Sequence, residues 1–423
     1  MSYPRMSMIA QALYSAPIQD IPAAVRSEIG KLQLRGTLPR GSRIAIACGS
    51  RGIANIALIT RIVAEEMKLL GWDPFLVPAM GSHGGATAEG QVEVLASYGL
   101  TEDYAGAPIL SSMDVVQLGV LPQGMPVYLD RHASEADATI VINRIKKHTD
   151  FTGPVESGLM KIMVAGLGNH LGATAIHDWG ARGLREFLVP AARMIIERAP
   201  VLFGIGVLDD GLEQTSEIHA IPASEIEKAE MALLVKANSY MARLPLDDID
   251  LLLVDRMGKE ISGIGMDTNV IGRIGIRGEP EFACPRVKWL IVFDLTTASF
   301  GNASGLGLAD FTVQRVVNKI DFDAWRANAI TSGFPERGKV PLTLATDKEA
   351  VDLGLRLLAG TRPEDARVVR VWDTLHLSRM QVSESLIAEL KHKDGIEVLT
   401  EPGELGFTPD GSLQPVDWAA WMA

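Results

Sequence analysis

Three of the chain's eight histidines, His148, His170 and His177, lie between Asn143 and His177. Histidine is the side chain whose ordinary titration falls nearest to neutral pH, and its neutral imidazole is also the commonest protein ligand for metals. A segment that collects such groups is a candidate for proton transfer or for metal binding.

His148 follows a short run of positive charge formed by Arg144, Lys146 and Lys147. Positive neighbours favour the neutral imidazole, which can accept a proton. Asp150, two residues further on, could instead orient the ring as a partner carboxylate. The alternative interpretation is a basic patch on the surface with no catalytic role.

Lys161 stands in an apolar, glycine-rich stretch, GLMKIMVAGLG. An amine that is shielded from water is a good candidate for a nucleophile or for a point of covalent attachment. The alternative is a lysine on a half-buried helix whose charged head reaches the solvent.

His170 and His177 are seven residues apart, so they share one face if the segment is helical. The chain contains no HExxH and no CxxC motif, and no carboxylates cluster with these histidines, so an ordinary zinc site is poorly supported. A metal held by one histidine and by a bound cofactor would escape such motif searches.

Two further polar clusters combine glycine with groups that can bind or react. Residues 48–55 (CGSRGIAN) contain Arg51, and the backbone N–H groups of Gly49 and Ser50 together with its guanidinium could bind a carboxylate or a phosphate. Residues 81–87 (GSHGGAT) carry His83 among three glycines, which allow a ligand to approach the backbone closely. The alternatives are an exposed arginine and a solvated histidine in a turn.

All three clusters directly follow apolar runs that we predict to be strands, at 42–48, 73–80 and 138–145. Amphipathic stretches at 55–71, 86–99 and 181–199 predict helices, the last with a kink at Pro190. Short strands that alternate with longer helices are typical of an α/β fold with a mainly parallel sheet. Functional loops in such folds follow the carboxyl ends of strands.

A second set of strands is predicted at 248–257, 288–295 and 340–346. We therefore expect two α/β domains with mainly parallel sheets, at 1–245 and 246–423, and an active-site cleft between them. We leave open whether the last residues of the chain pack back on the first domain. The glycine-punctuated segment 255–273, with Lys259, Asp267, Asn269 and Arg273, either closes this cleft or forms an ordered surface loop.

Composition excludes several classes of protein. The chain has 423 residues, 47% of them hydrophobic, and a net charge of −12, which argues against a nucleic-acid-binding surface. Cys48 and Cys284 suggest no disulfide framework. No long apolar run and no secretion signal is recognisable, so we expect a cytoplasmic protein that does not bind membranes. The GxGxxG, GxxxxGK[ST] and GxSxG motifs are also missing.

Taken together, the clusters resemble the lactate racemase family, the nickel-pincer-nucleotide-dependent racemases and epimerases of 2-hydroxy acids. The resemblance rests on Arg51 after the first strand, His83 in the GSHGG turn and His148 after the third strand. It also rests on Lys161 in its glycine-rich run and on His177, sixteen residues beyond that lysine. It covers most of the first domain and extends only loosely to the second.

The resemblance implies a cofactor built on a pyridinium mononucleotide, whose two sulfur-containing arms and ring carbon hold nickel. It makes His177 the protein's nickel ligand and Lys161 the lysine that in some members is joined covalently to the cofactor. Gly49 and Ser50 are expected to contact the cofactor as well.

By the same resemblance, His83 and His148 are the paired acid and base, and Arg51 holds the substrate carboxylate. Lys259 is expected to contact the substrate from the second domain. Removing hydrogen from C2 as hydride is easier when a base takes the hydroxyl proton at the same time. A planar 2-keto acid then receives the hydride on its other face, which inverts the centre.

Two departures from the family bear on the substrate and on the cofactor linkage. His83 is followed by two glycines where lactate racemases have an arginine and a proline, so the substrate pocket differs. The segment between His148 and Lys161 is about three residues longer. We therefore expect a larger 2-hydroxy acid or sugar acid at least as readily as lactate, and proteins of cofactor synthesis as partners.

Two other functions stay open. One is a binding or regulatory protein without turnover, which the presence of both His83 and His148 argues against. The other is a dehydrogenase or zinc lyase that uses the same cleft, which the missing nucleotide and metal motifs argue against.

Overall fold

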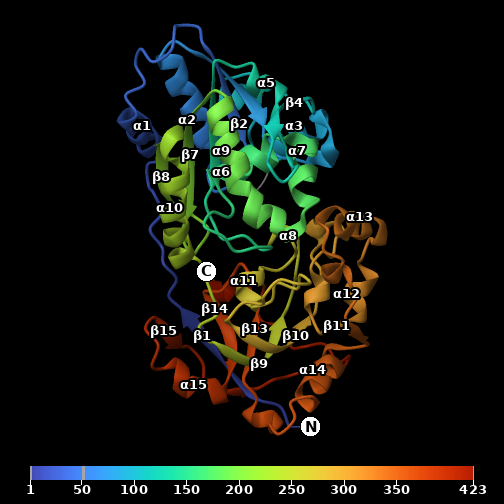
Figure 1. Ribbon diagram of the computed structural model, residues 1–423. Helices are drawn as coiled ribbons and strands as arrows, with labels where there is room; N and C mark the ends of the chain where they lie inside the picture. The colour runs from blue at the N-terminus through green and yellow to red at the C-terminus, as the bar shows by residue number, and fades with distance from the viewer. Residues whose placement is uncertain (1, 50–52, 423) are drawn as a thin grey trace. The chain divides into compact units, whose positions relative to one another are not determined.

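Alternate residues of the first predicted strand face two different layers of helices. The computed structural model describes residues 2–49 and 53–422 (Figure 1). In it the predicted strand is β2 (Arg43–Cys48), with Ile44 and Ile46 packed in one core and Ala45 and Ala47 in another. Such a strand is buried on both faces, as expected in the middle of a parallel sheet.

The described chain forms two compact units. We call Tyr14–Met241 the first unit, and residues 2–13 together with 242–422 the second unit. The predicted division after residue 245 lies four residues beyond the observed one. Our assignment of the first thirteen residues to the N-terminal domain is wrong, because β1 (Arg5–Gln11) pairs with strands from the end of the chain.

The first unit has a five-stranded sheet in the order β3-β2-β6-β7-β8, parallel except for β8. Its other strands are β3 (Asp73–Pro78), β6 (Ala138–Arg144), β7 (Val201–Asp209) and β8 (Thr215–Pro222), and a separate hairpin joins β4 (Val115–Val120) to β5 (Pro126–Asp130).

Helices cover both faces of this sheet. On one face lie α1 (Ile21–Lys31) and α2 (Ile56–Leu69), and on the other α6 (Leu159–Lys161), α9 (Leu188–Arg198) and α10 (Ile226–Tyr240) (Figure 1). The remaining helices of the unit are α3 (Ala88–Ser97), α4 (Glu102–Ala105), α5 (Arg131–Ser134), α7 (Asn169–His177) and α8 (Gly180–Arg182).

Two π-helical turns interrupt these helices. One, Ile162–Gly166, continues α6, and the other, Gly183–Phe187, joins α8 to α9. The predicted helix at 181–199 therefore changes its hydrogen-bonding pattern a few residues before Pro190, close to the expected kink. No helix in the described ranges is both long enough and apolar enough to span a membrane.

The second unit has a nine-stranded sheet in the order β12-β11-β10-β9-β13-β14-β1-β15, with β16 also paired to β1. The pairs from β12 to β13 are parallel, and the remainder are antiparallel. The predicted α/β class with largely parallel sheets is confirmed. The strands are β9 (Asp248–Val254), β10 (Arg286–Val292), β11 (Phe311–Val313), β12 (Leu342–Leu344), β13 (Val368–Val371), β14 (Arg379–Ser383), β15 (Ile396–Val398) and β16 (Gly403–Glu404).

The last helix stays with this second sheet. Trp418 of α16 (Trp418–Met422) donates its indole N–H to Asp255 just after β9, at 2.7 Å. Asp255 belongs to the same unit, so this bond holds the buried tryptophan within the second unit. The other helices of the unit are α11 (Thr268–Ile271), α12 (Gln314–Asn318), α13 (Phe322–Ser332), α14 (Asp347–Arg356) and α15 (Glu384–Leu390).

Strand order in both sheets reverses at one point. In the first unit the chain passes from β2 to β3 on one side and later adds β6 on the other side. In the second unit it runs from β9 outward to β12 and returns with β13 on the opposite side of β9. Loops diverge at such a switch point, and the space between them is where open α/β sheets bind ligands.

The packing of β1 can be tested with Ile9, which is fully buried. Replacing it with alanine should lower the free energy of unfolding by about 2–5 kcal/mol, since it empties a closed core position. Ile330→Ala, at a site that is 72% exposed, should change it by less than about 0.5 kcal/mol. Urea unfolding of both variants measures this, and equal effects would contradict the placement of β1 in the sheet.

Candidate functional site

The three loops singled out in the sequence follow β2, β3 and β6, which are neighbours in the first sheet. Gly49 comes directly after β2, and a Cβ added there would lie 3.3 Å from the Cδ1 atom of Ile162 and 3.4 Å from the Oδ1 atom of Asn143. Glycine thus lets this loop approach the turn that follows Lys161. Ser50 and Arg51 lie outside the described residues.

The turn that carries His83 is fixed by its glycines and by a buried amide. Gly81 donates its N–H to Gly166 at 3.1 Å, and its carbonyl accepts from Gln91 at 3.0 Å. A Cβ on Gly84 would lie only 2.5 Å from the backbone of α3. His83 itself is exposed. Since β2 lies between β3 and β6, the His83 turn stands two strand spacings, roughly 10 Å, from the β6 edge.

His148 lies in a loop whose two ends are paired. Lys146 and Ser157 exchange two backbone hydrogen bonds, of 2.8 and 3.1 Å, which close the loop at its base. Inside it the ring of His148 packs against that of Phe151, with 4.8 Å between centroids. The imidazole is largely buried, at 10% exposure of the side chain.

Glu156 holds this loop from within. Its carboxylate, 1% exposed, accepts the backbone N–H of His148 at 2.7 Å and that of Gly153 at 3.3 Å, and it pairs with the Lys147 ammonium at 3.1 Å. Burial raises the pKa of Glu156, and the hydrogen bonds and the charge of Lys147 oppose that shift. Glu156 therefore positions the backbone of His148.

The two ring nitrogens of His148 have different partners. The Nδ1 atom accepts the backbone N–H of Asp150 at 3.0 Å, and the carboxylate of Asp150 lies 3.8 Å away from it. The Nε2 atom contacts the Nζ atom of Lys161. Because Nδ1 accepts, the neutral ring carries its proton on Nε2. The backbone N–H of Asp150 thus meets Nδ1, and the possibility that its carboxylate orients the ring stays a prediction.

His177 lies close enough to the same lysine to feel its charge. Burial lowers the pKa of His177 to about 4, and the positive charge of Lys161 acts in the same direction against Asp150 and Asp178. The Nδ1 atom of His177 is buried and has no hydrogen-bond partner among the described residues. At neutral pH the ring is therefore neutral and keeps a lone pair for a metal or a proton. His170, on the same helix, is exposed.

A second buried carboxylate supports the helical turn that carries Lys161. Glu230 of α10 accepts the backbone N–H of Met160 at 2.9 Å, and a Cβ on Gly158 would collide with it. Burial raises the pKa of Glu230 to about 7, against the backbone hydrogen bonds from Met160 and Leu159. A carboxyl group at the start of a helix satisfies N–H groups that have no partner within the helix.

Lys259 follows β9 in the second unit. Its Nζ atom donates to the carbonyl of Gly263 at 2.7 Å and to the Oδ1 atom of Asn328 at 2.8 Å. In the same segment, Asp267 caps α11 and Arg273 pairs with Asp310 at 2.7 Å. These polar candidates thus have structural partners within their own unit.

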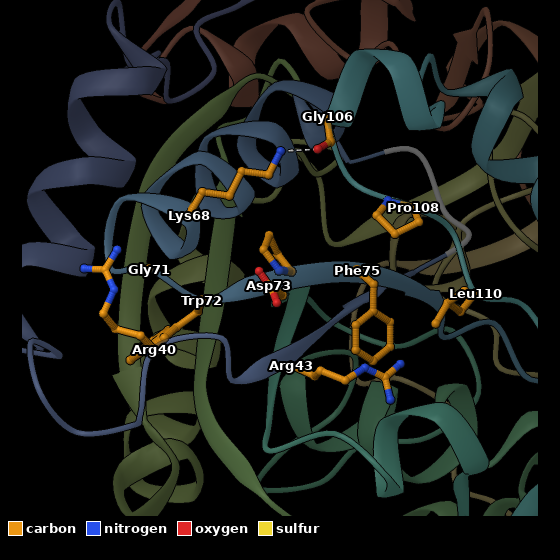
Figure 2. Close-up of a pocket in the computed structure, with 11 residues that line it drawn as sticks. Arg40, Arg43, Lys68, Gly71, Trp72, Asp73, Phe75, Gly106, Pro108 and Leu110 are labelled. Carbon is orange, nitrogen blue, oxygen red and sulfur yellow. Dashed lines mark hydrogen bonds between the residues drawn. The ribbon is translucent and has the colours of Figure 1, made fainter.

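A cavity of about 590 Å³ lies at the other end of the first unit's strands (Figure 2). Arg43 and Asp73, the first residues of β2 and β3, line it together with Arg40 and Lys68, whereas the candidate site follows the carboxyl ends of the same strands. The cavity is therefore separate from the candidate site.

The described side chains do not build a metal site by themselves. No group of three histidine, cysteine, aspartate or glutamate side chains is suitably placed within residues 2–49 and 53–422. What they build is a site in which an imidazole, an amine and a second imidazole converge at the switch point of a parallel sheet.

This combination of fold and site defines a class of two-unit α/β proteins, and comparison with known proteins shows what the chain is similar to. Residues 8–179 match the family model of the lactate racemase N-terminal domain. The resemblance stated from the sequence is confirmed there. No curated protein matches the chain.

The structure of the lactate racemase apoprotein from Thermoanaerobacterium thermosaccharolyticum is similar in fold. The similarity covers 85% of this chain and 93% of that one, with 15% sequence identity and a TM-score of 0.51. At this identity the likeness shows the fold alone.

Sequence reasoning missed Glu156 and Glu230. No periodic pattern marks Glu156, which lies in an irregular loop. Glu230 carried a usable signal, because it falls on the buried stripe of α10 with Ile226, Leu234 and Ala237, where a charged residue is out of place.

Glu156→Gln should lower the free energy of unfolding by about 3 kcal/mol, because it leaves the Lys147 ammonium without its buried partner. Amide hydrogen exchange should also quicken in residues 147–157. Glu186→Gln breaks an exposed pair with Arg182 and should cost less than about 1 kcal/mol. Exchange in the loop as slow as in the unaltered protein would contradict the role given to Glu156.

Glu230 should make stability depend on pH. Its pKa is raised from 4.5 to about 7 in the folded protein, so the folded state holds the proton more tightly. The resulting stabilisation, on the order of 3 kcal/mol, is complete below the unfolded value and is lost as pH rises through the folded one. Glu230→Gln cannot ionise, so it should lose less stability than the unaltered protein between about pH 5 and about pH 8. Urea unfolding at several pH values measures this. The prediction is refuted if the free energy of unfolding changes with pH in the same way in Glu230→Gln and in the unaltered protein.

Proposed function

We propose that the protein is a nickel-pincer-nucleotide-dependent racemase or epimerase that inverts C2 of a 2-hydroxy acid. The observation that carries the proposal is the contact of His148 Nε2 with Lys161 Nζ, with His177 near enough to feel the lysine's charge. The family match over residues 8–179 supports it.

The residues present fit such a cofactor. His177 offers a neutral imidazole with a buried nitrogen that lacks a partner among the described residues, and in our proposal it is the nickel ligand. Gly49 packs closely against Ile162, in the turn that follows Lys161. We assign Lys161 to holding or tethering the cofactor, and Gly49 and Ser50 to contacting it. When bound, the cofactor would supply a hydride acceptor and donor for C2.

The chain's own groups would handle the substrate and its proton. We assign His148 to one of the two proton-transfer roles, with the Asp150 carboxylate 3.8 Å from its Nδ1 atom. His83, on its rigid turn, serves as the second acid or base, because the hydroxyl is reached from two sides in the two configurations. Arg51 is assigned to the substrate carboxylate and Lys259 to a further substrate contact.

The substrate class follows from the His83 turn. Two glycines after His83 present no side chain to the ligand, so a 2-hydroxy acid or sugar acid larger than lactate fits the proposal. Proteins that synthesise the cofactor are the partners it requires, and a cytoplasmic location is consistent with it.

His177→Ala tests the assignment of the nickel ligand. In protein co-produced with a cofactor-synthesis pathway, this variant should lose nickel because its fourth ligand is gone. His170→Ala, an exposed neighbour on the same helix, should keep it. Nickel is measured per mole of protein by elemental analysis. Unchanged nickel in His177→Ala would show that another residue binds the metal.

The same preparation tests the reaction. A panel of 2-hydroxy acids and aldonic acids should reveal inversion at C2 with the hydrogen isotope retained in the molecule. His148→Gln should reduce the rate by about 10²- to 10⁴-fold while nickel stays bound. Bound zinc, or no inversion in a nickel-loaded protein, would favour a lyase, a dehydrogenase or a binding protein instead.

A further inference from the structure

The switch point of the second sheet carries a polar cluster that the proposed function does not use. It lies where β9 and β13 end side by side, and it consists of Arg256, Trp372, Asp373 and His376. Backbone hydrogen bonds join the two loops, from Arg256 to Trp372 at 3.0 Å and from Asp255 to Val371 at 3.0 Å. Its position is the one at which open α/β sheets bind ligands.

Asp373 is fully buried and orients both cationic side chains of the cluster. Its Oδ1 atom accepts from the Nδ1 atom of His376 at 2.8 Å, and its Oδ2 atom accepts from the Nε and Nη2 atoms of Arg256 at 3.1 and 2.9 Å. Burial acts to raise the pKa of Asp373, but the bonds from His376 and Arg256 outweigh it and hold that pKa below its ordinary value. The carboxylate is therefore charged and fully engaged.

Trp372 forms a shared wall for the same two side chains. The Arg256 guanidinium stacks on its ring at 3.5 Å, and the His376 ring packs against it with 4.9 Å between centroids. An arginine that is stacked and paired on one edge loses little entropy when its other edge binds a ligand. The cluster is thus ordered before any ligand arrives.

Two donors remain available on the outer side. The Nη1 atom of Arg256 and the Nε2 atom of His376 have no partner among the described residues, and their side chains are 29% and 40% exposed. Since Nδ1 donates to Asp373, the Nε2 atom can take a proton from solvent and then donate as well.

We propose that Arg256 and His376, oriented by Asp373, form a second binding site for a small organic carboxylate. The outer edge of a guanidinium offers parallel N–H groups that match the two oxygens of a carboxylate, and His376 adds a donor beside it. The proposed function assigns a role to none of these residues, so the site goes beyond it and requires none of the nickel or proton-transfer groups.

A titration of the full chain with acetate tests this site. Histidine ring signals are followed by NMR in the unaltered protein and are assigned with His376→Gln and His392→Gln, the latter at an exposed position in the same unit. Acetate should shift the His376 signals saturably and leave those of His392 in place. Arg256→Gln should weaken binding by about tenfold or more, since a hydrogen bond to a charged group is lost.

The controls separate a site from a general effect of salt or of folding. Arg277→Gln removes an arginine that is 83% exposed in the same unit and should leave the affinity unchanged. Arg256→Lys keeps a positive charge near Asp373 but loses the parallel N–H groups of the guanidinium, so this variant too should bind acetate more weakly. The proposal would be overturned if the His376 signals moved only in parallel with those of His392. It would also be overturned if inorganic phosphate shifted the His376 signals as much as acetate does. Neither nickel content nor C2 inversion enters this measurement.

Discussion

A half-buried amine that faces an imidazole, Lys161 Nζ against His148 Nε2, is the contact on which the first unit's site depends. A hydrogen bond between these two nitrogens needs a proton on one of them and a lone pair on the other. The surrounding fold holds the pair together from both sides. Glu156 fixes the backbone of His148, and Glu230 fixes the helical turn that presents Lys161. Both carboxylates are buried, so neither segment can move without leaving a polar group unpaired.

Glycine makes the approach of these segments possible. Gly81 lies against the carbonyl of Ala165 and Gly166 against that of Ala79, at distances where any side chain would collide. The His83 turn and the π-helical turn after Lys161 are therefore packed backbone to backbone. The two loops that carry these histidines are then held in place by the same π-helical turn. Displacing that turn would therefore move both His83 and His148.

Much of this arrangement was predictable because it follows from local patterns. The strands at 42–48, 73–80 and 138–145 and the polar loops after them could be inferred from the spacing of apolar residues and glycines, and so could the convergence of those loops at one edge. Strand β1 could not, because antiparallel pairing with β14 joins segments more than 360 residues apart without a local signal. Glu156 escaped for a related reason, since its partners are set by the path of an irregular loop.

Both units place an oriented imidazole at a switch point, and they do so with different chemistry. In the first unit a backbone N–H occupies Nδ1 of His148, while in the second the buried carboxylate of Asp373 accepts from Nδ1 of His376. The first arrangement leaves a proton on the outer nitrogen of a neutral ring, and the second leaves a lone pair there. The same position in two parallel sheets is therefore suited to exchanging a proton with an amine in one unit and to holding an anion in the other.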